Sequence, residues 1–180
     1  MRSGTVILFI ASMFLMAVMP VKIHSISSGS KYIKPVRDSC DSIPAPIGHV
    51  NDFEHILTPG QIGILEEMIR EYEDSTSNQI ALVTIPTTMV TYANFERFTL
   101  QMINCWHVGQ KFKNNGILIG ISAGYKRIRI QNGYGIEKVL SNAETKRIID
   151  VEFVPNFKRS HYYDGIYYGL KSIMFKAKKI

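Results

Sequence analysis

Two short, almost wholly apolar runs constrain the fold of this chain most strongly, at residues 79–86 (QIALVTIP) and 116–122 (GILIGIS). Runs of this length without polar alternation are typical of strands covered on both faces. The segment between them, 92–106, has helical spacing, with apolar and aromatic side chains every three or four residues. A strand, a crossover helix and a second strand form a right-handed parallel unit. Residues 127–131 (RIRIQ) alternate in polarity after a short turn, which predicts a hairpin and an added antiparallel strand.

Helical signals lie on both sides of these strands. Thr58-Pro59-Gly60-Gln61 supplies a capping residue, a first-turn proline and a glutamine three residues after the cap, which together predict a helix start. Two more helices are expected, from about 142 to 153 and from about 162 to 178. The order of these elements predicts an α/β fold, a three-layer Rossmann-like α/β/α sandwich around a small mixed sheet.

The N-terminal part of the chain differs in composition from this body. An apolar run of 14 residues, 6–19, follows Arg2 and precedes a polar stretch, which is the order of a signal peptide; we place it at residues 1–25. As a helix the run would span about 21 Å, short of a hydrocarbon core of roughly 30 Å. An uncleaved membrane anchor is the alternative. Residues 26–49, rich in Ser, Gly and Pro, predict a flexible linker, and 50–180 the folded domain.

A net charge of +6 would by itself suggest a nucleic-acid or membrane partner. The distribution of the charged residues along the chain changes this interpretation. Residues 48–170 carry 12 basic and 13 acidic side chains, so the basic excess belongs to the two ends. Binding of nucleic acid needs a basic face on the domain itself. We therefore expect no nucleic-acid partner, and contact with a membrane only through an uncleaved leader.

Cys40 and Cys105 are the two cysteines of the chain. Export would permit a disulfide between them. The pattern favours the alternative, in which Cys40 is a linker thiol and Cys105 a small apolar residue buried in a helix.

Named catalytic signatures are absent from the sequence, including G-x-S-x-G, H-E-x-x-H, the P-loop and a complete G-x-G-x-x-G. The predicted hairpin nevertheless brings the loop 109–115 beside the loop 132–137, and the helix start at Ser141-Asn142 can join them. We expect a polar cluster at this edge of the sheet. Its candidate residues are Asp52, Asn114, Asn115, Gly133, Tyr134, Gly135, Glu137 and Asn142.

Two interpretations of this cluster are open. Oxygen donors from Asn114, Glu137 and Asn142 suit Ca²⁺ or another divalent cation, although one carboxylate is little charge for tight binding. The alternative, which the residues favour, is that the asparagines form turns and that Asn142 caps a helix. Gly133 and Gly135 indicate a glycine-assisted turn rather than a dinucleotide site.

From about Val50 to Met174 the chain resembles the TPM domain family. The matching residues stand in order: Val50-Asn51-Asp52, Gln79-Ile80-Ala81-Leu82-Val83, Asn115-Gly116-Ile117-Leu118-Ile119, Gly133-Tyr134-Gly135-Ile136-Glu137, Pro155-x-Phe157 and Tyr163-x-Gly165. The resemblance implies an α/β/α sandwich in an exported or membrane-tethered protein. It also implies acid phosphatase activity in some members, cation binding in others and an auxiliary receptor subunit in another.

The chain departs from the family pattern at the polar cluster. Asn114 stands where the family has the aspartate of Asp-Asn-Gly, and Asn142 stands where it has a second aspartate. An amide cannot act as a general base. We therefore expect an exported, periplasmic or secreted, non-catalytic accessory or quality-control module for an unidentified envelope or membrane protein. The alternative is a metal-dependent acid phosphatase acting on phosphomonoesters, in which Glu137 or Asp52 serves as acid or base and Lys111 or Lys113 receives phosphate.

Overall fold

The computed structural model describes residues 40–178. The predicted signal peptide and residues 26–39 of the predicted linker lie outside this range. The strands are β1 (Val50–Asp52), β2 (Gln79–Thr84), β3 (Gly116–Ser122) and β4 (Arg127–Asn132). The helices are α1 (Pro59–Thr76), α2 (Phe95–Cys105), α3 (Tyr134–Glu137), α4 (Asn142–Ile148), α5 (Val154–Phe157) and α6 (Tyr162–Ala177). Two 3₁₀ turns, η1 (Cys40–Ser42) and η2 (Tyr92–Asn94), and a π-helical turn, η3 (Ile149–Phe153), complete the elements.

The four strands form one mixed sheet in the order β1-β2-β3-β4. β1 and β2 pair in parallel, as do β2 and β3, and β4 runs antiparallel beside β3. The predicted parallel pairing of β2 with β3 and the predicted hairpin are confirmed. β1 was not predicted as a strand, because three residues are too short to show a period.

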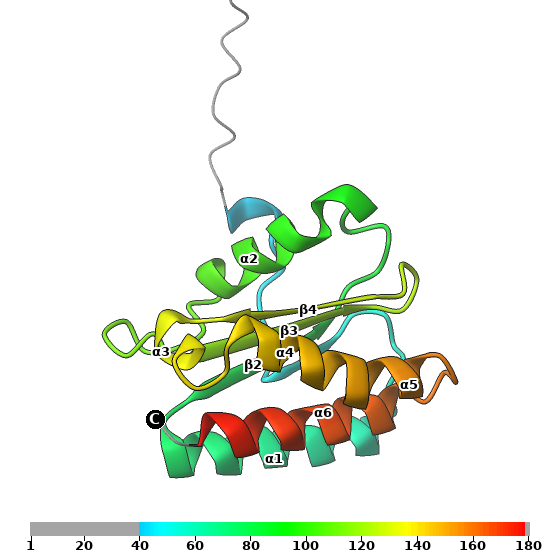
Figure 1. The fold of residues 1–180 in the computed structure, drawn as a ribbon. Helices are drawn as coiled ribbons and strands as arrows, with labels where there is room; N and C mark the ends of the chain where they lie inside the picture. Colours follow the sequence, from blue (N-terminus) through cyan, green and yellow to red (C-terminus); the bar gives the residue numbers. More distant parts are fainter. Residues whose placement is uncertain (1–39, 179–180) are drawn as a thin grey trace, which may run out of the picture. The chain divides into compact units, whose positions relative to one another are not determined.

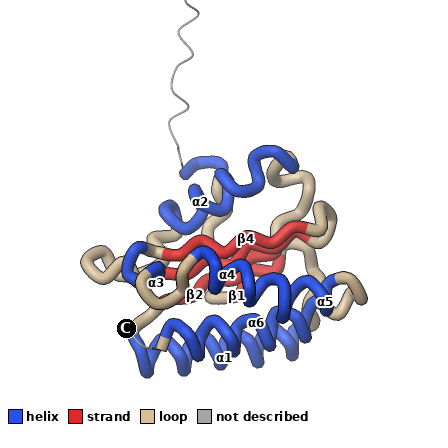
Figure 2. Tube along the Cα trace, in the orientation of Figure 1, coloured by secondary structure: helices blue, strands red, loops and turns tan. Residues whose placement is uncertain are grey.

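Helices cover both faces of the sheet, which confirms the α/β/α sandwich (Figures 1 and 2). α1 and α6 share one apolar core with the side chains of Leu82, Ile119 and Ile130, whereas α2 shares the other with Val83 and Leu118. The connection from β1 through α1 to β2 and the connection from β2 through α2 to β3 both move to the next strand in the same direction along the sheet. α1 lies on one face of the sheet, whereas α2 lies on the other. The two connections therefore have opposite hands, and one is of the rare left-handed kind. Among the described helices none is long and apolar enough to cross a membrane.

Residues 40–49 belong to the folded body, so the predicted linker is wrong over this stretch. Cys40 forms a disulfide with Cys105 at the end of α2. Ile43 is buried in the core beneath α2, and the indole Nε1 of Trp106 donates to the carbonyl oxygen of Pro44 at 2.7 Å. The interpretation of Cys40 as a linker thiol is also wrong. Its sequence neighbours gave no sign of the pairing, because Pro-rich composition does not distinguish a free linker from an extended segment packed on a helix.

The C-terminal helices also differ in detail from the prediction. The expected helix 142–153 is α4 followed by the π-helical turn η3, and α5 continues beyond it with Pro155 near its N-terminus. A proline is tolerated there because the first turn of a helix needs no N–H donor. Start and end of α6 agree with the prediction to within one residue.

His49 joins the segment before β1 to α1. Its Nδ1 lies 2.9 Å from Glu66 and its Nε2 lies 3.1 Å from Glu73. Burial lowers the pKa of His49, but the hydrogen bonds to the two carboxylates outweigh it, so the pKa is raised. The protonated ring therefore stabilises the fold.

This raised pKa predicts a pH-dependent effect of His49→Gln. The stabilisation is fully present below the unfolded pKa of about 6.5 and is lost as the pH rises through the higher folded value. Because the side chain is 33% exposed, the variant should lose about 0.5–1 kcal/mol of unfolding free energy at pH 6, and less at pH 9. Urea denaturation at both pH values measures the loss. His161→Gln, which removes a more exposed histidine, is the control and should cost less than about 0.5 kcal/mol at pH 6. An equal loss for His49→Gln at both pH values would contradict the prediction.

Candidate functional site

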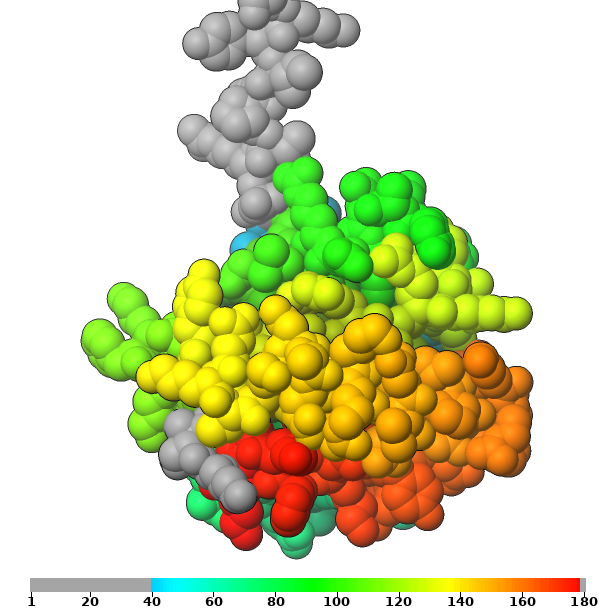
Figure 3. All heavy atoms as spheres, viewed as in Figure 1, coloured from blue at the N-terminus to red at the C-terminus, as the bar shows by residue number. Residues whose placement is uncertain are grey.

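The two loops that were predicted to meet lie side by side at one end of the sheet. Asn114, Gly133, Tyr134 and Glu137 line a single open groove of about 900 Å³. One wall is the end of α2 and the loop 109–115, which we call the Phe112 loop. The other wall is the end of β4 with α3. The Phe112 loop projects from the domain beside this groove (Figures 1 and 3).

Gly133 and Gly135 hold the two walls together by close backbone approach. A Cβ on Gly133 would collide with the carbonyl oxygen of Asn114, and one on Gly135 with that of Lys113. Their amides donate to Gly116 at 2.8 Å and to Asn114 at 3.0 Å. The predicted glycine-assisted turn is a one-turn helix, α3, in which neither glycine has a positive φ; the glycines allow the close approach that braces the Phe112 loop.

Asn115 has the structural role that the residues favoured. Its side chain is buried, accepts from the amide of Gln110 at 2.8 Å and donates to the carbonyl of Ser77 at 2.6 Å. Asn114 adopts a left-handed conformation, with φ of 49°, and lines the groove. One asparagine therefore fixes the base of the Phe112 loop, whereas the other faces the groove.

Asn142 does not join the groove. It is exposed in the first turn of α4 and is not part of the groove lining. The cap of α4 is Ser141, whose hydroxyl accepts from the amide of Glu144 at 3.3 Å. The prediction that Asn142 caps this helix is wrong by one residue, since a serine is as good a cap as an asparagine.

Asp52 lies at the opposite end of the sheet from the groove. It pairs with Thr84 at the carboxyl end of β2, whereas the groove lies beside the amino end of β3. One carboxylate oxygen accepts from the Thr84 hydroxyl at 2.6 Å and from the Ile56 amide at 3.2 Å; the other accepts from the Leu57 amide at 2.8 Å. Asp52 thus shapes the turn between β1 and α1, and placing it with the cluster was wrong.

A divalent cation would find few charged ligands here. Within residues 40–178 there is no group of three or more His, Cys, Asp or Glu side chains that could hold a metal. The groove offers the Glu137 carboxylate with the amides of Asn114 and Asn132. Asn132 donates to Leu140 and Thr145, but its Oδ1 is buried and is the one such side-chain atom of the described residues that lacks a partner. This donor set fits a weakly bound hard cation and not a high-affinity calcium site.

Comparison with known proteins decides the family. The family model described as TPM domain matches residues 50–175, most of the chain. The chain belongs to the TPM domain family.

Solved structures share the fold of this TPM domain. The N-terminal domain of a protein from P. gingivalis is 29% identical, with a TM-score of 0.65, over 71% of this chain and 80% of that one. A protein from the psychrophilic bacterium Bizionia argentinensis is 20% identical, with a TM-score of 0.59, over 71% and 85%. The N-terminal domain of a protein from Corynebacterium glutamicum is 12% identical, with a TM-score of 0.54, over 74% and 83%. No curated protein sequence matches the chain significantly.

Sequence reasoning missed the most exposed apolar side chain beside the groove of this TPM domain. Phe112 is 95% exposed, and Tyr134 and Leu100, which line the groove, are 78% and 51% exposed. The available signal was the order Lys111-Phe112-Lys113, a single aromatic residue between two lysines in an otherwise polar loop.

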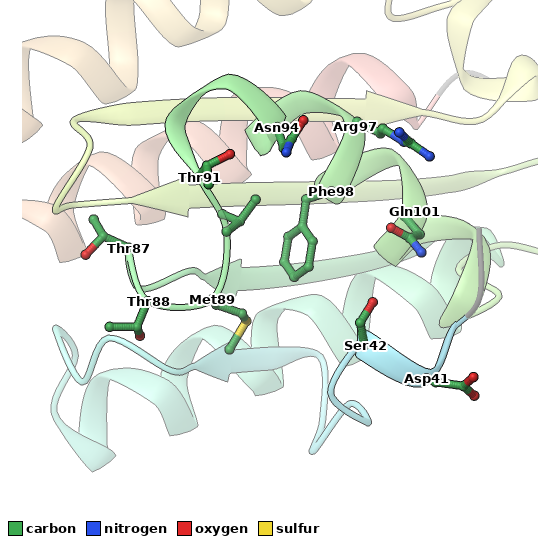
Figure 4. Close-up of a pocket in the computed structure, with 11 residues that line it drawn as sticks. Asp41, Ser42, Thr87, Thr88, Met89, Thr91, Asn94, Arg97, Phe98 and Gln101 are labelled. Atoms are coloured by element: carbon green, nitrogen blue, oxygen red, sulfur yellow. The ribbon is translucent and has the colours of Figure 1, made fainter. Parts of the chain in front are cut away.

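A second hollow of about 540 Å³ lies between η1, α2 and the loop after β2. Figure 4 shows Phe98 and Met89 together with the hydroxyls of Thr87, Thr88 and Thr91 around it. The disulfide holds η1, one wall of this hollow, against α2. This hollow could not be predicted from the sequence, since it exists only once residues 40–43 are folded against α2.

Proposed function

We propose that this TPM domain is an exported accessory or quality-control module that docks on a protein of an envelope or membrane complex. The Phe112 loop and the adjoining groove make the contact. The observation that carries the proposal is the 95% exposure of Phe112 on a braced loop. A leader-like N-terminus and a disulfide support export, because disulfides persist in oxidising compartments.

The brace is what suits the Phe112 loop to binding. Interfaces gain most of their energy from a few central aromatic or arginine side chains. A loop that is already held in place loses little conformational entropy when a partner orders it. Because Gly133, Gly135 and Asn115 fix the base of the loop, Phe112 is presented at low entropic cost.

Charge indicates the kind of segment that would bind. Lys111 and Lys113 flank Phe112, and Glu137 is the one carboxylate among the residues that line the groove. Electrostatic complementarity favours a partner segment with an apolar residue beside acidic ones. We therefore expect an acidic, apolar stretch of the partner to contact the loop.

The positions of the carboxylates favour binding over catalysis. The two that would serve as acid or base, Asp52 and Glu137, lie at opposite ends of the sheet. Hydrogen bonds from Thr84 and two backbone amides already engage Asp52. A general acid or base must lie within hydrogen-bond reach of the proton that it transfers, so Asp52 cannot serve a substrate in the groove, and Glu137 would have to act there without it.

Site-specific photo-crosslinking tests the docking surface. A benzophenone amino acid in place of Phe112 should give one discrete adduct in an envelope fraction. The same group in place of Phe175, an exposed phenylalanine of α6, should not. Phe112→Ser should lower recovery of that adduct partner at least about tenfold, with the melting temperature unchanged. Turnover of p-nitrophenyl phosphate that is lost in Glu137→Gln would replace the proposal with the phosphatase alternative.

The unpartnered Oδ1 of Asn132 favours a second candidate role, weak binding of a divalent cation in the groove. For a dissociation constant near 1 mM, 10 mM Ca²⁺ should add about 1.4 kcal/mol to the unfolding free energy. Thermal unfolding with Ca²⁺ or chelator measures this gain. Asn114→Asp should enlarge it, whereas Asn142→Asp, outside the groove, is the matched control and should leave it unchanged. Absence of any shift in both wild type and Asn114→Asp would remove this candidate.

A further inference from the structure

A third hollow lies at the opposite end of the sheet from the groove. It encloses about 350 Å³ between the β3–β4 hairpin and the connection from α5 to α6. Ser122, the last residue of β3, forms part of its lining. The hollow therefore sits beyond the carboxyl end of β3.

The polar side of this hollow is positively charged. Lys126 from the hairpin and Lys158 from the end of α5 line it, and its lining contains no acidic residue. Neither ammonium group has an ion-pair or hydrogen-bond partner among residues 40–178. Arg127 also contributes to the lining, but its guanidinium is committed to Glu96 at 3.2 Å and to the Tyr92 carbonyl at 2.7 Å. The charge available to a ligand is that of the two lysines.

The remaining lining is apolar or hydroxylic. Ile128 and Val154 contribute aliphatic surface, and the ring of Phe157 lies 5.1 Å from that of Tyr162. The hydroxyl of Ser122 is buried and accepts only a long, 3.4 Å contact from the amide of Tyr125. An aromatic wall under a pair of cations suits a ligand that is both apolar and anionic.

Backbone conformation points to the side chain of Lys126. Its φ is 53°, in the left-handed region that glycine adopts without steric cost. A glycine would therefore fold this turn with less strain than lysine does. Strained residues cluster at functional sites, and here the strained residue supplies one of the two free charges.

We propose that this hollow binds a small amphipathic anion, namely a single ring bearing one anionic group. The anionic group pairs with Lys126 and Lys158, and the ring packs on Phe157. The volume is within the range of small-molecule pockets, at its lower end. This site is separate from the groove, so the proposal does not depend on the docking function.

Titration of the full chain, followed by amide chemical shifts, tests the proposal with four probes. Benzoate and phenyl phosphate carry both a ring and a charge, benzyl alcohol carries only the ring, and inorganic phosphate only the charge. We expect saturable shifts around Ser122, Phe157 and Tyr162 for the first two probes. Their affinities should exceed those of benzyl alcohol and inorganic phosphate at least tenfold.

Lys126→Gly separates binding from folding. It should lower the affinity for benzoate at least fivefold while the melting temperature stays equal or rises, because the left-handed strain is relieved. Lys126→Arg should retain binding, and Lys111→Ala, in the Phe112 loop, should leave it unchanged. Absence of saturable shifts at 10 mM benzoate and phenyl phosphate, equal binding of benzyl alcohol, or unchanged affinity in Lys126→Gly would each overturn the proposal.

Discussion

Reduction of the Cys40–Cys105 disulfide is expected to lower the free energy of unfolding by about 3–4 kcal/mol. The two cysteines are 65 positions apart, so the bond removes many conformations from the unfolded chain. It also holds residues 40–43 against α2, where Ile43 is buried. Urea denaturation with and without a thiol reductant, at one pH, measures the loss.

The variant Cys40→Ser/Cys105→Ser is the control for this experiment. Its unfolding midpoint should match that of the reduced wild type and should not respond to the reductant. Equal midpoints for oxidised and reduced wild type would contradict the expected stabilisation. A stabilising disulfide would in turn support the proposed export, because reducing compartments keep thiols free.

Phe153→Ala should have an effect of similar size, a loss of about 4 kcal/mol. The ring of Phe153 is fully buried in the π-helical turn between α4 and α5. It lies against Gly169 of α6 and meets Phe157 edge-on at a centroid distance of 5.7 Å. Truncation leaves a cavity that the surrounding helices can fill only in part. Chemical denaturation of the variant measures the loss.

Two further variants show whether packing is the cause. Phe175→Ala removes a phenylalanine of α6 that is 69% exposed, and should cost less than about 0.5 kcal/mol. Gly169→Ala should destabilise the wild type, because the added Cβ collides with the Phe153 ring. In the Phe153→Ala background the same change should cost less. Equal costs of Gly169→Ala in both backgrounds would show that the contact with Phe153 is not responsible.

Local signals in the sequence determined most of the secondary structure. The cap at Thr58 forms the predicted capping box with Gln61, and α1 begins at the next residue, Pro59. The apolar runs became β2 and β3, whose residues pair from Gln79↔Gly116 to Thr84↔Ile121. Each of these signals acts over a few residues, so it can be recognised without knowledge of the rest of the fold.

The candidate site was predicted only in part. The contact between the Phe112 loop and the turn at Gly133 could be predicted from the hairpin. Hairpin pairing is local, and it places the start of β3 beside the end of β4. Asp52 and Asn142 were grouped with them on chemical type, and the structure separates both from the groove. Chemical type does not indicate which end of a strand or which turn of a helix faces a shared space.

The sequence by itself determined the fold class, the family and most of the elements, down to the residues at which β2, β3 and α1 begin. Only the tertiary structure decided that α1 and α2 cover opposite faces, that Cys40 meets Cys105, and that Phe112 stands exposed beside a groove. The physical reason is the distance along the chain over which each kind of interaction acts. Periodicity, caps and turns are set by neighbouring residues, whereas crossover hand, cysteine pairing and exposure depend on how segments dozens of residues apart pack against one another.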